Sequence, residues 1–241
     1  MPATPSGTPR RGGLSALTLL LAAAPVAAAA ATPVAPPPRG DPPAAAHEIR
    51  IDPRDFKVVP RDSGPVNYYT VVDDPEGAFI RGAYAPPNQT AVLGWALPGD
   101  LHRPVARVRW RWRILAFPQG GNECQSGKTD SAAVIYLTWK RGLRFYAVKY
   151  VWSTVGPTGA ICARRRNIFA AQDTIIVESG GPLGKWRTVD VDPDAEFRKY
   201  FESGNPKADV AAFQGIGILS DGDQTQSPAA ADFGGFVLTL R

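Results

Sequence analysis

The stretch from residue 107 to residue 114 reads Arg-Val-Arg-Trp-Arg-Trp-Arg-Ile, and it decides the fold class. Apolar and basic side chains alternate strictly, so in an extended chain all the apolar ones share one face. That face consists of Val108, Trp110, Trp112 and Ile114. A helix would not keep the two kinds apart over eight residues. The stretch therefore predicts a β-strand that buries two tryptophans and presents an arginine row (residues 107, 109, 111 and 113) to solvent.

Similar alternation runs through the rest of the chain from residue 48 onward, interrupted by turn-forming residues. With 24 glycines and 24 prolines in 241 residues, the composition favours short strands joined by turns over a helical bundle. We expect strands near 55–59, 66–72, 78–84, 90–97, 105–116, 131–139, 143–152, 173–178, 185–191, 213–220 and 233–240. One short helix is expected at 194–202, with Asp194 as its N-cap. Eleven strands without intervening helices predict an all-β fold, an antiparallel β-sandwich or jelly roll.

The N-terminal segment has the order of a secretory signal peptide. Arg10 and Arg11 precede an apolar run at 14–24, and a polyalanine stretch ends near Ala31. A retained membrane anchor is the alternative, although the run is short for a span and no later stretch reaches about 18 apolar residues. We therefore expect a signal peptide at 1–31, a Pro/Ala-rich linker at 32–47 and one β-sandwich domain at 48–241. The mature protein is expected in the periplasm or outside the cell, without a transmembrane span.

The charge balance and the rare residues narrow the function. Residues 1–31 hold two arginines and no acidic residue, so their removal lowers the formal net charge from +5 to +3. A nucleic-acid-binding protein usually has a stronger basic excess, so we expect no nucleic acid as a partner. An acidic polysaccharide or an outer-membrane surface suits this charge. Two cysteines and two histidines exclude a Cys/His zinc cluster.

The segment 131–152 predicts a β-hairpin with a three-residue loop, Lys140-Arg141-Gly142, in which glycine takes the left-handed position. This register gathers polar and aromatic side chains on one face of the hairpin. They are Asp130, Tyr136, Arg144, Tyr146, Tyr150 and Trp152. Aromatic rings can stack on sugars, and arginine can bind a carboxylate or sulfate, so we treat this face as a candidate ligand platform. The alternative is an inner sheet face covered by other parts of the chain.

The two cysteines flank this hairpin. Cys124 precedes it and Cys162 follows it, and antiparallel pairing brings the two flanks to the same end of the sheet. In an oxidising compartment such a pair predicts a disulfide bond.

A second candidate site follows the strand near 213–220. Its oxygen-bearing side chains are Asp221, Asp223, Thr225 and Asp232. Oxygen ligands on a tight loop are what calcium prefers, so this loop is a candidate site for a structural calcium ion. The alternative is a turn in which these side chains hydrogen-bond to the nearby backbone.

Several motifs in chain order resemble a known family. They are Trp110-Arg111-Trp112-Arg113, Asp130, Tyr150-Val151-Trp152, Val177-Glu178-Ser179-Gly180, Trp186 and Ser220-Asp221-Gly222-Asp223-Gln224-Thr225. The combination resembles the domain of unknown function 3047 family of exported or envelope-associated bacterial proteins, over residues 50–241. The family typically has two acidic residues before the hairpin, whereas Thr129-Asp130 keeps one. The resemblance implies a β-sandwich similar to carbohydrate-binding modules and jelly-roll lectins, and no established reaction.

Three functions remain open at this stage. The first is a non-catalytic glycan-binding or envelope-associated module, which needs only a platform of aromatic and polar groups. The second is a polysaccharide lyase or hydrolase, which needs a positioned general acid and base. The third is a purely structural envelope protein. We expect the first, because no histidine falls on the hairpin strands and no carboxylate pair can be placed from the sequence.

Overall fold

The computed structural model describes residues 47–59, 67–101 and 104–241. The expected signal peptide (1–31) and all but the last residue of the expected linker lie outside these residues. The strands that the structure describes are β1 (His47–Arg50), β2 (Lys57–Val58), β3 (Tyr69–Val72), β4 (Phe79–Tyr84), β5 (Leu93–Ala96), β6 (Val105–Ala116), β7 (Ala133–Arg141), β8 (Arg144–Ser153), β9 (Ile161–Arg166), β10 (Ala170–Ser179), β11 (Arg187–Val191), β12 (Ala212–Leu219) and β13 (Ala229–Leu240). One α-helix, α1 (Pro193–Phe201), and two short 3-10 helices, Pro53–Asp55 and Gly99–Leu101, complete these elements. None of the helices in this part of the chain is both long and apolar enough to span a membrane.

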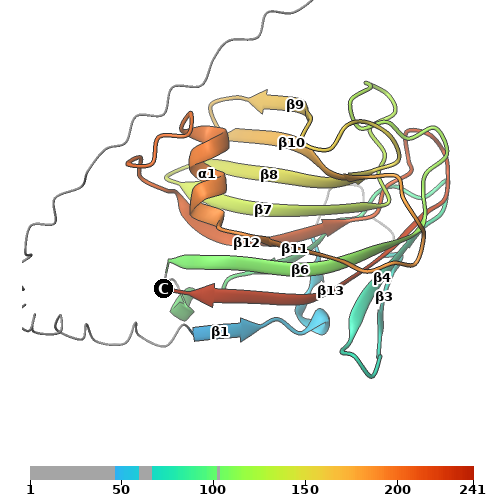
Figure 1. Ribbon diagram of the computed structural model, residues 1–241, viewed down its shortest axis with the longest axis horizontal. Helices are drawn as coiled ribbons and strands as arrows, with labels where there is room; N and C mark the ends of the chain where they lie inside the picture. The colour runs from blue at the N-terminus through green and yellow to red at the C-terminus, as the bar shows by residue number, and fades with distance from the viewer. Residues whose placement is uncertain (1–46, 60–66, 102–103) are drawn as a thin grey trace, which may run out of the picture. The chain divides into compact units, whose positions relative to one another are not determined.

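The strands form two sheets, which confirms the predicted all-β sandwich (Figure 1). The six-stranded sheet has the order β11-β6-β13-β4-β3, with β1 paired to β13. The seven-stranded sheet has the order β2-β5-β12-β7-β8-β10-β9. Its pairs are antiparallel except β8 and β10, which are parallel because the chain first forms the edge strand β9 and then returns between β8 and β9. The sandwich is therefore mixed rather than purely antiparallel.

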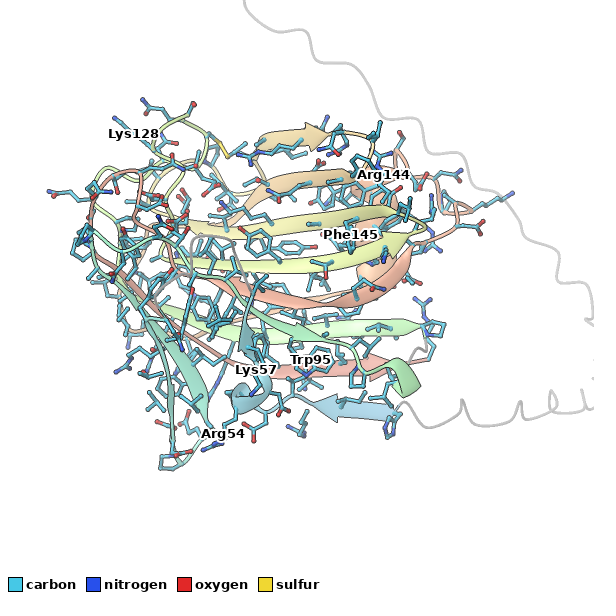
Figure 2. All side chains as sticks on the ribbon, turned by 180° about the vertical axis from the view of Figure 1, so that it is seen from behind. Arg54, Lys57, Trp95, Lys128, Arg144 and Phe145 are labelled. Atoms are coloured by element: carbon cyan, nitrogen blue, oxygen red, sulfur yellow. A yellow bond between two sulfur atoms is a disulfide. The ribbon has the colours of Figure 1, made fainter. Side chains whose placement is uncertain are left out.

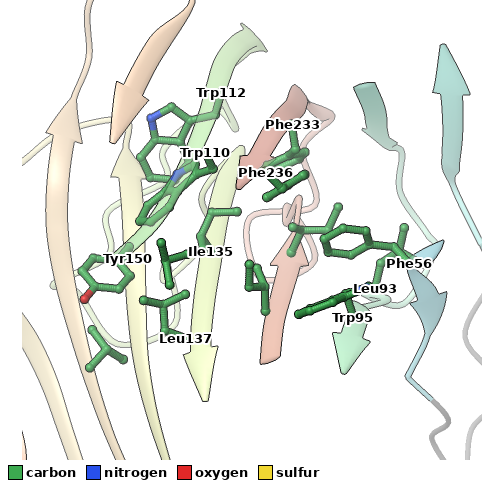
Figure 3. Packing of buried hydrophobic residues seen from close by; sticks show 14 of the residues in the cluster. Phe56, Leu93, Trp95, Trp110, Trp112, Ile135, Leu137, Tyr150, Phe233 and Phe236 are labelled. Carbon is green, nitrogen blue, oxygen red and sulfur yellow. The ribbon is translucent and has the colours of Figure 1, made fainter. Parts of the chain in front are cut away.

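The core lies between the two sheets and contains the aromatic residues that the alternation of 107–114 predicts. Trp110 and Trp112 on β6 are fully buried. The ring of Trp110 lies 5.6 Å from that of Tyr150, and the ring of Trp112 lies 5.9 Å from that of Trp152, so each pair joins the two sheets. Figure 3 shows Trp110, Tyr150 and Ile135 packed together there. Edge and tilted aromatic contacts of this kind add to the free energy of burial.

Helix α1 covers one end of this core. Asp192 caps it by accepting hydrogen bonds from the backbone N–H groups of Asp194 (2.9 Å) and Ala195 (3.1 Å), so the expected cap, Asp194, is wrong by two residues. Phe197 is fully buried and packs against Trp139 and Tyr146 of the seven-stranded sheet. The helix therefore seals the inner face of this sheet near the β7–β8 turn.

The outer face of the seven-stranded sheet positions the site described next. Register places Gly94 of β5, Gly217 of β12, Tyr136 of β7 and Lys149 of β8 in one row across the strands. Near Lys149 this face is covered by the segment 117–132, which joins β6 to β7 and contacts the sheet through Glu123. Between β2 and β7 the face has an open groove.

Candidate functional site

The β7–β8 hairpin has a different register from the expected one. Arg141 pairs with Arg144, so the turn contains two residues, Gly142 and Leu143, and Gly142 has a positive φ of 58°. Tyr146 then lies opposite Trp139, and Tyr150 opposite Ile135. The predicted three-residue loop is therefore wrong, and each residue of β8 pairs with a different residue of β7 from the one expected.

This register buries the aromatic side chains of the expected ligand platform. Tyr146, Tyr150 and Trp152 are 9%, 1% and 2% exposed and belong to the inner core. The Tyr150 hydroxyl donates a hydrogen bond of 2.6 Å to Glu196, and burial raises the pKa of Tyr150 well above its usual value. Trp152 donates to the carbonyl oxygen of Gly180. An exposed sugar-stacking surface made of these three side chains is therefore wrong.

The remaining members of that platform lie apart from one another. Arg144 stands at the β7–β8 turn with its guanidinium 5.3 Å from the ring of Tyr146. Asp130 belongs to a carboxylate cluster beyond the other end of the hairpin. Tyr136 alone lies on the outer face, in the row with Gly217 and Lys149.

The groove on this outer face holds a cavity of about 590 Å³. It is lined by polar, apolar and glycine residues of β2, β5, β7, β10 and β12. They include Lys57, Gly94, Tyr136, Thr138, Gln172, Gln214 and Gly217. Sequence reasoning missed most of these residues, although the alternation of β7 places Tyr136 and Thr138 on the same face. Figure 2 shows Lys57 and Trp95 on the neighbouring strands β2 and β5.

Two glycines of β12 shape this part of the sheet: Gly217 lines the groove, and Gly215 allows the close approach of β5. A Cβ atom at Gly217 would lie 3.3 Å from the Cβ and Cδ2 atoms of Tyr136, so the glycine leaves this side of the tyrosine uncovered. A Cβ atom at Gly215 would lie 2.1 Å from the backbone oxygen of Trp95, which no other residue can tolerate. The register shifts by one residue between Phe213 and Gly215, and this bulge brings Gln214 into the groove lining.

The segment that covers the rest of this face is held by a disulfide and a buried ion pair. The structure confirms the bond between Cys124 and Cys162, whose Cα atoms are 4.4 Å apart. The Lys149 ammonium lies 2.6 Å from Glu123, and the Ser131 hydroxyl donates a hydrogen bond of 2.9 Å to the same carboxylate. These contacts were missed from the sequence, where Glu123 and Lys149 lie 26 residues apart.

Asp130, Asp221 and Asp223 form a carboxylate cluster, each with an oxygen within 4.8 Å of the others. Asp130 accepts hydrogen bonds of 2.6 Å from both the backbone N–H and the hydroxyl of Thr225. Burial, and then the charges of Asp223 and Asp130, raise the pKa of Asp221 to about 7. The structure thus brings three of the four expected metal-site residues to one place and adds Asp130.

The fourth expected metal ligand, Asp232, lies elsewhere. It is fully buried on β13, where register places it opposite Arg81 and Arg113. Arg81 donates two hydrogen bonds to it, of 2.8 and 2.9 Å, and Arg113 a third, of 2.7 Å. This carboxylate pairs with two guanidinium groups and is not available to the cluster at Asp221.

The same contacts correct the expectation of a solvated arginine row on β6. Arg113 binds Asp232, Arg107 lies 2.8 Å from Asp190, and Arg111 lies 4.5 Å from the ring of Trp186. A second groove, of about 570 Å³, lies over this sheet and includes Arg109 and Arg111. Asp52 and Glu76 line it as well, so its charge is partly balanced.

Comparisons with solved structures find β-sandwich proteins of low sequence identity. One is a family 11 carbohydrate-binding module from Clostridium thermocellum in complex with a β-1,3-1,4-mixed-linked tetrasaccharide, with a TM-score of 0.41, 10% identity and coverage of 79% of this chain and 94% of that chain. Another is the xyloglucanase domain of NopAA from Sinorhizobium fredii in complex with cellobiose. Its TM-score is 0.40 and its identity 10%, and the match covers 82% of this chain and 99% of that chain. A third is Trichoderma harzianum endoglucanase 3 from family GH12. Its TM-score is 0.39 and its identity 9%, and the match covers 83% of this chain and 100% of that chain. At such scores these similarities extend to no ligand or activity of this chain.

No curated protein matches the sequence. A family model does, over residues 63–237, which is most of the chain and nearly all of the described sandwich. The family is described as a protein of unknown function, DUF3047. The chain therefore belongs to the DUF3047 family, as its motifs led us to expect.

Proposed function

We propose that the protein is a non-catalytic carbohydrate-binding module of the bacterial envelope, and that it binds glycan in the groove on the outer face of the seven-stranded sheet. The observation that carries the proposal is the make-up of this groove, whose cavity of about 590 Å³ combines an aromatic ring with amide and hydroxyl groups over glycines. A sugar ring offers a C–H face and a rim of hydroxyls, so it requires both an apolar surface and fixed hydrogen-bonding groups. Tyr136 supplies the first, and Gln172 and Gln214 supply the second.

Because the aromatic residues Tyr146, Tyr150 and Trp152 of the expected platform are buried, the proposed binding site is the groove on the outer face. The two-residue turn directs Tyr146 and Tyr150 into the core and leaves Tyr136 on the outer face. The binding groups are thus carried by β7, β10 and β12 instead of β8. An exported location agrees with the disulfide between Cys124 and Cys162, because such bonds persist in oxidising compartments.

The experiment is affinity electrophoresis in gels that contain neutral or acidic polysaccharides, guided by a glycan array. Tyr136→Ala and Gln172→Ala should each abolish or strongly reduce retardation while near-ultraviolet circular dichroism stays unchanged. Gln119→Ala is the matched control, since Gln119 is exposed and does not line the groove. Equal retardation of Tyr136→Ala and wild type would refute the groove as the binding site.

The same material separates binding from the two alternatives. Release of unsaturated or reducing-end products from a polysaccharide would assign a lyase or hydrolase. An absence of retardation with every glycan would leave the structural envelope role.

We further propose that calcium binds at Asp130, Asp221 and Asp223 and stabilises the loop 220–228. Three carboxylates within 4.8 Å supply the hard oxygen ligands that this ion prefers. Lys149 lowers the pKa of Asp221, but its ammonium group binds Glu123 directly, so the cluster keeps uncompensated negative charge. Thr225 then acts as a hydrogen-bond donor that orients Asp130, rather than as a metal ligand.

A further inference from the structure

Two neighbouring turns at one end of the seven-stranded sheet expose large apolar side chains. The β7–β8 turn contains Leu143, which is 80% exposed, and the β9–β10 turn contains Ile168 and Phe169, which are 79% and 60% exposed. The turns lie side by side because β8 pairs with β10, and the Phe145 N–H donates a hydrogen bond of 2.8 Å to the Phe169 carbonyl. Phe145 itself is 52% exposed. We call these four residues the apolar tip.

Exposure of this degree is unusual for a group of adjacent apolar side chains. Single exposed hydrophobic residues are common and need no explanation, but clusters of them mark sites of protein or membrane interaction. Nothing in the described part of the chain covers the apolar tip. It also belongs to none of the grooves described above, so a small ligand would find no enclosing walls there.

Positive charge surrounds the apolar tip. Five cations adjoin the two turns. Arg141 and Arg166 form ion pairs with Glu202 and Asp173. Within the described residues Lys140, Arg144 and Arg165 form no ion pair with a carboxylate. The Lys140 ammonium lies 4.9 Å from the ring centroid of Phe145, so charge and apolar surface adjoin directly. Figure 2 shows Arg144 and Phe145 together at this end of the sheet, far from Lys128 at the other end.

We propose that the apolar tip inserts into the interfacial region of an anionic lipid bilayer, with Lys140, Arg144 and Arg165 contacting lipid phosphates. The arrangement fits a bilayer because apolar side chains can enter the acyl region only if the neighbouring charges stay at the headgroups. Cations next to an anionic leaflet add electrostatic attraction. A glycan would offer hydroxyl groups, for which Leu143 and Ile168 have no partners. The surface is thus separate from the glycan groove, and it would hold that groove at a membrane.

The test is co-sedimentation of the full chain with vesicles of phosphatidylglycerol and phosphatidylethanolamine, and with phosphatidylcholine vesicles of the same size. The double variant Ile168→Asp/Phe169→Asp should bind anionic vesicles at least tenfold more weakly than wild type. Leu183→Asp is the matched control. Leu183 is 53% exposed, but it follows the C-terminal end of β10, whereas Ile168 and Phe169 precede the N-terminal end of β10. The apolar stretch at 14–24 is common to all three proteins, so differences between them report the apolar tip.

A second measurement reports insertion at the site itself. Phe169→Trp should be quenched by brominated acyl chains, whereas Leu183→Trp should not. Equal sedimentation of the double variant and wild type, or no extra quenching at residue 169, would overturn the proposal. Equal binding to phosphatidylcholine would overturn the anionic specificity. A concentration-dependent dimer that Ile168→Asp/Phe169→Asp abolishes would assign the apolar tip to self-association instead. In all cases the double variant should keep glycan retardation, so this proposal and the glycan site can fail independently.

Discussion

Lys149 and Glu123 form an ion pair of 2.6 Å that is almost completely buried between the outer face of the seven-stranded sheet and the segment above it. Removing one partner of such a pair leaves a charge without compensation in a poorly hydrated site, which costs more than the pair itself contributes. Glu123→Gln should therefore lower the free energy of unfolding by about 3 kcal/mol. Denaturant titration measures this. The double variant Glu123→Leu/Lys149→Met should recover most of the loss, and a double variant as unstable as the single one would contradict this explanation.

The disulfide between Cys124 and Cys162 closes a loop around the whole β7–β8 hairpin. Its main effect is expected on the unfolded chain, whose entropy it reduces. For a separation of 38 residues this stabilises the protein by about 4 kcal/mol in the chain-entropy model. The variant Cys124→Ser/Cys162→Ser should lose this amount in urea titrations. A loss below about 1 kcal/mol would show that the reduced chain is already restricted by other contacts.

Asp221 should make stability depend on pH in the direction opposite to most carboxyl groups. Its pKa is about 7 in the folded protein, against 3.8 for an exposed aspartate, so the folded state holds a proton that the unfolded chain releases at lower pH. Stability contributed by this group therefore declines as pH rises from about 4 to 7 and is constant above that range. In EDTA, the difference in unfolding free energy between wild type and Asp221→Asn should fall by about 2 to 3 kcal/mol between pH 5 and pH 7. A difference independent of pH would contradict the assigned pKa.

Calcium should reverse this penalty at pH 8 by binding the ionised cluster. At a calcium concentration 100 times the dissociation constant, the melting temperature of wild type should rise by roughly 5 to 10 °C. Asp223→Asn should abolish the rise, because it removes one of the three clustered carboxylates. Asp55→Asn should keep it, since Asp55 is an exposed carboxylate outside the cluster. Differential scanning fluorimetry decides between these outcomes, and magnesium at the same concentration tests ion selectivity.

The local sequence pattern predicted correctly those parts of the fold that depend on the alternation within a single strand. The alternation at 107–114 places Trp110 and Trp112 in the core, since a strand with one apolar face has a single favourable orientation. The bond between Cys124 and Cys162 follows from the hairpin alone and did not require its exact register. Strand β9 is not among the expected strands, because the three consecutive arginines at 164–166 lack the apolar alternation of a strand. It forms an edge strand, in which Arg164 and Arg166 pair with buried Asp173.

The candidate sites depended on contacts that only the tertiary structure decides. The hairpin turn at Gly142 accepts two- and three-residue loops locally, and the choice between them depends on which side chains the opposite sheet can bury. Asp130 and Asp221 are 91 positions apart in the sequence, yet they lie in one cluster. Asp232 is closer to Asp221 in sequence, but it forms ion pairs with Arg81 and Arg113 instead. The sequence by itself thus determined most of the strands, though not β1 or β9, and the all-β class, because alternation is a property of one strand. The open groove and the carboxylate cluster arise from pairing between distant strands, so only the assembled sandwich could define them.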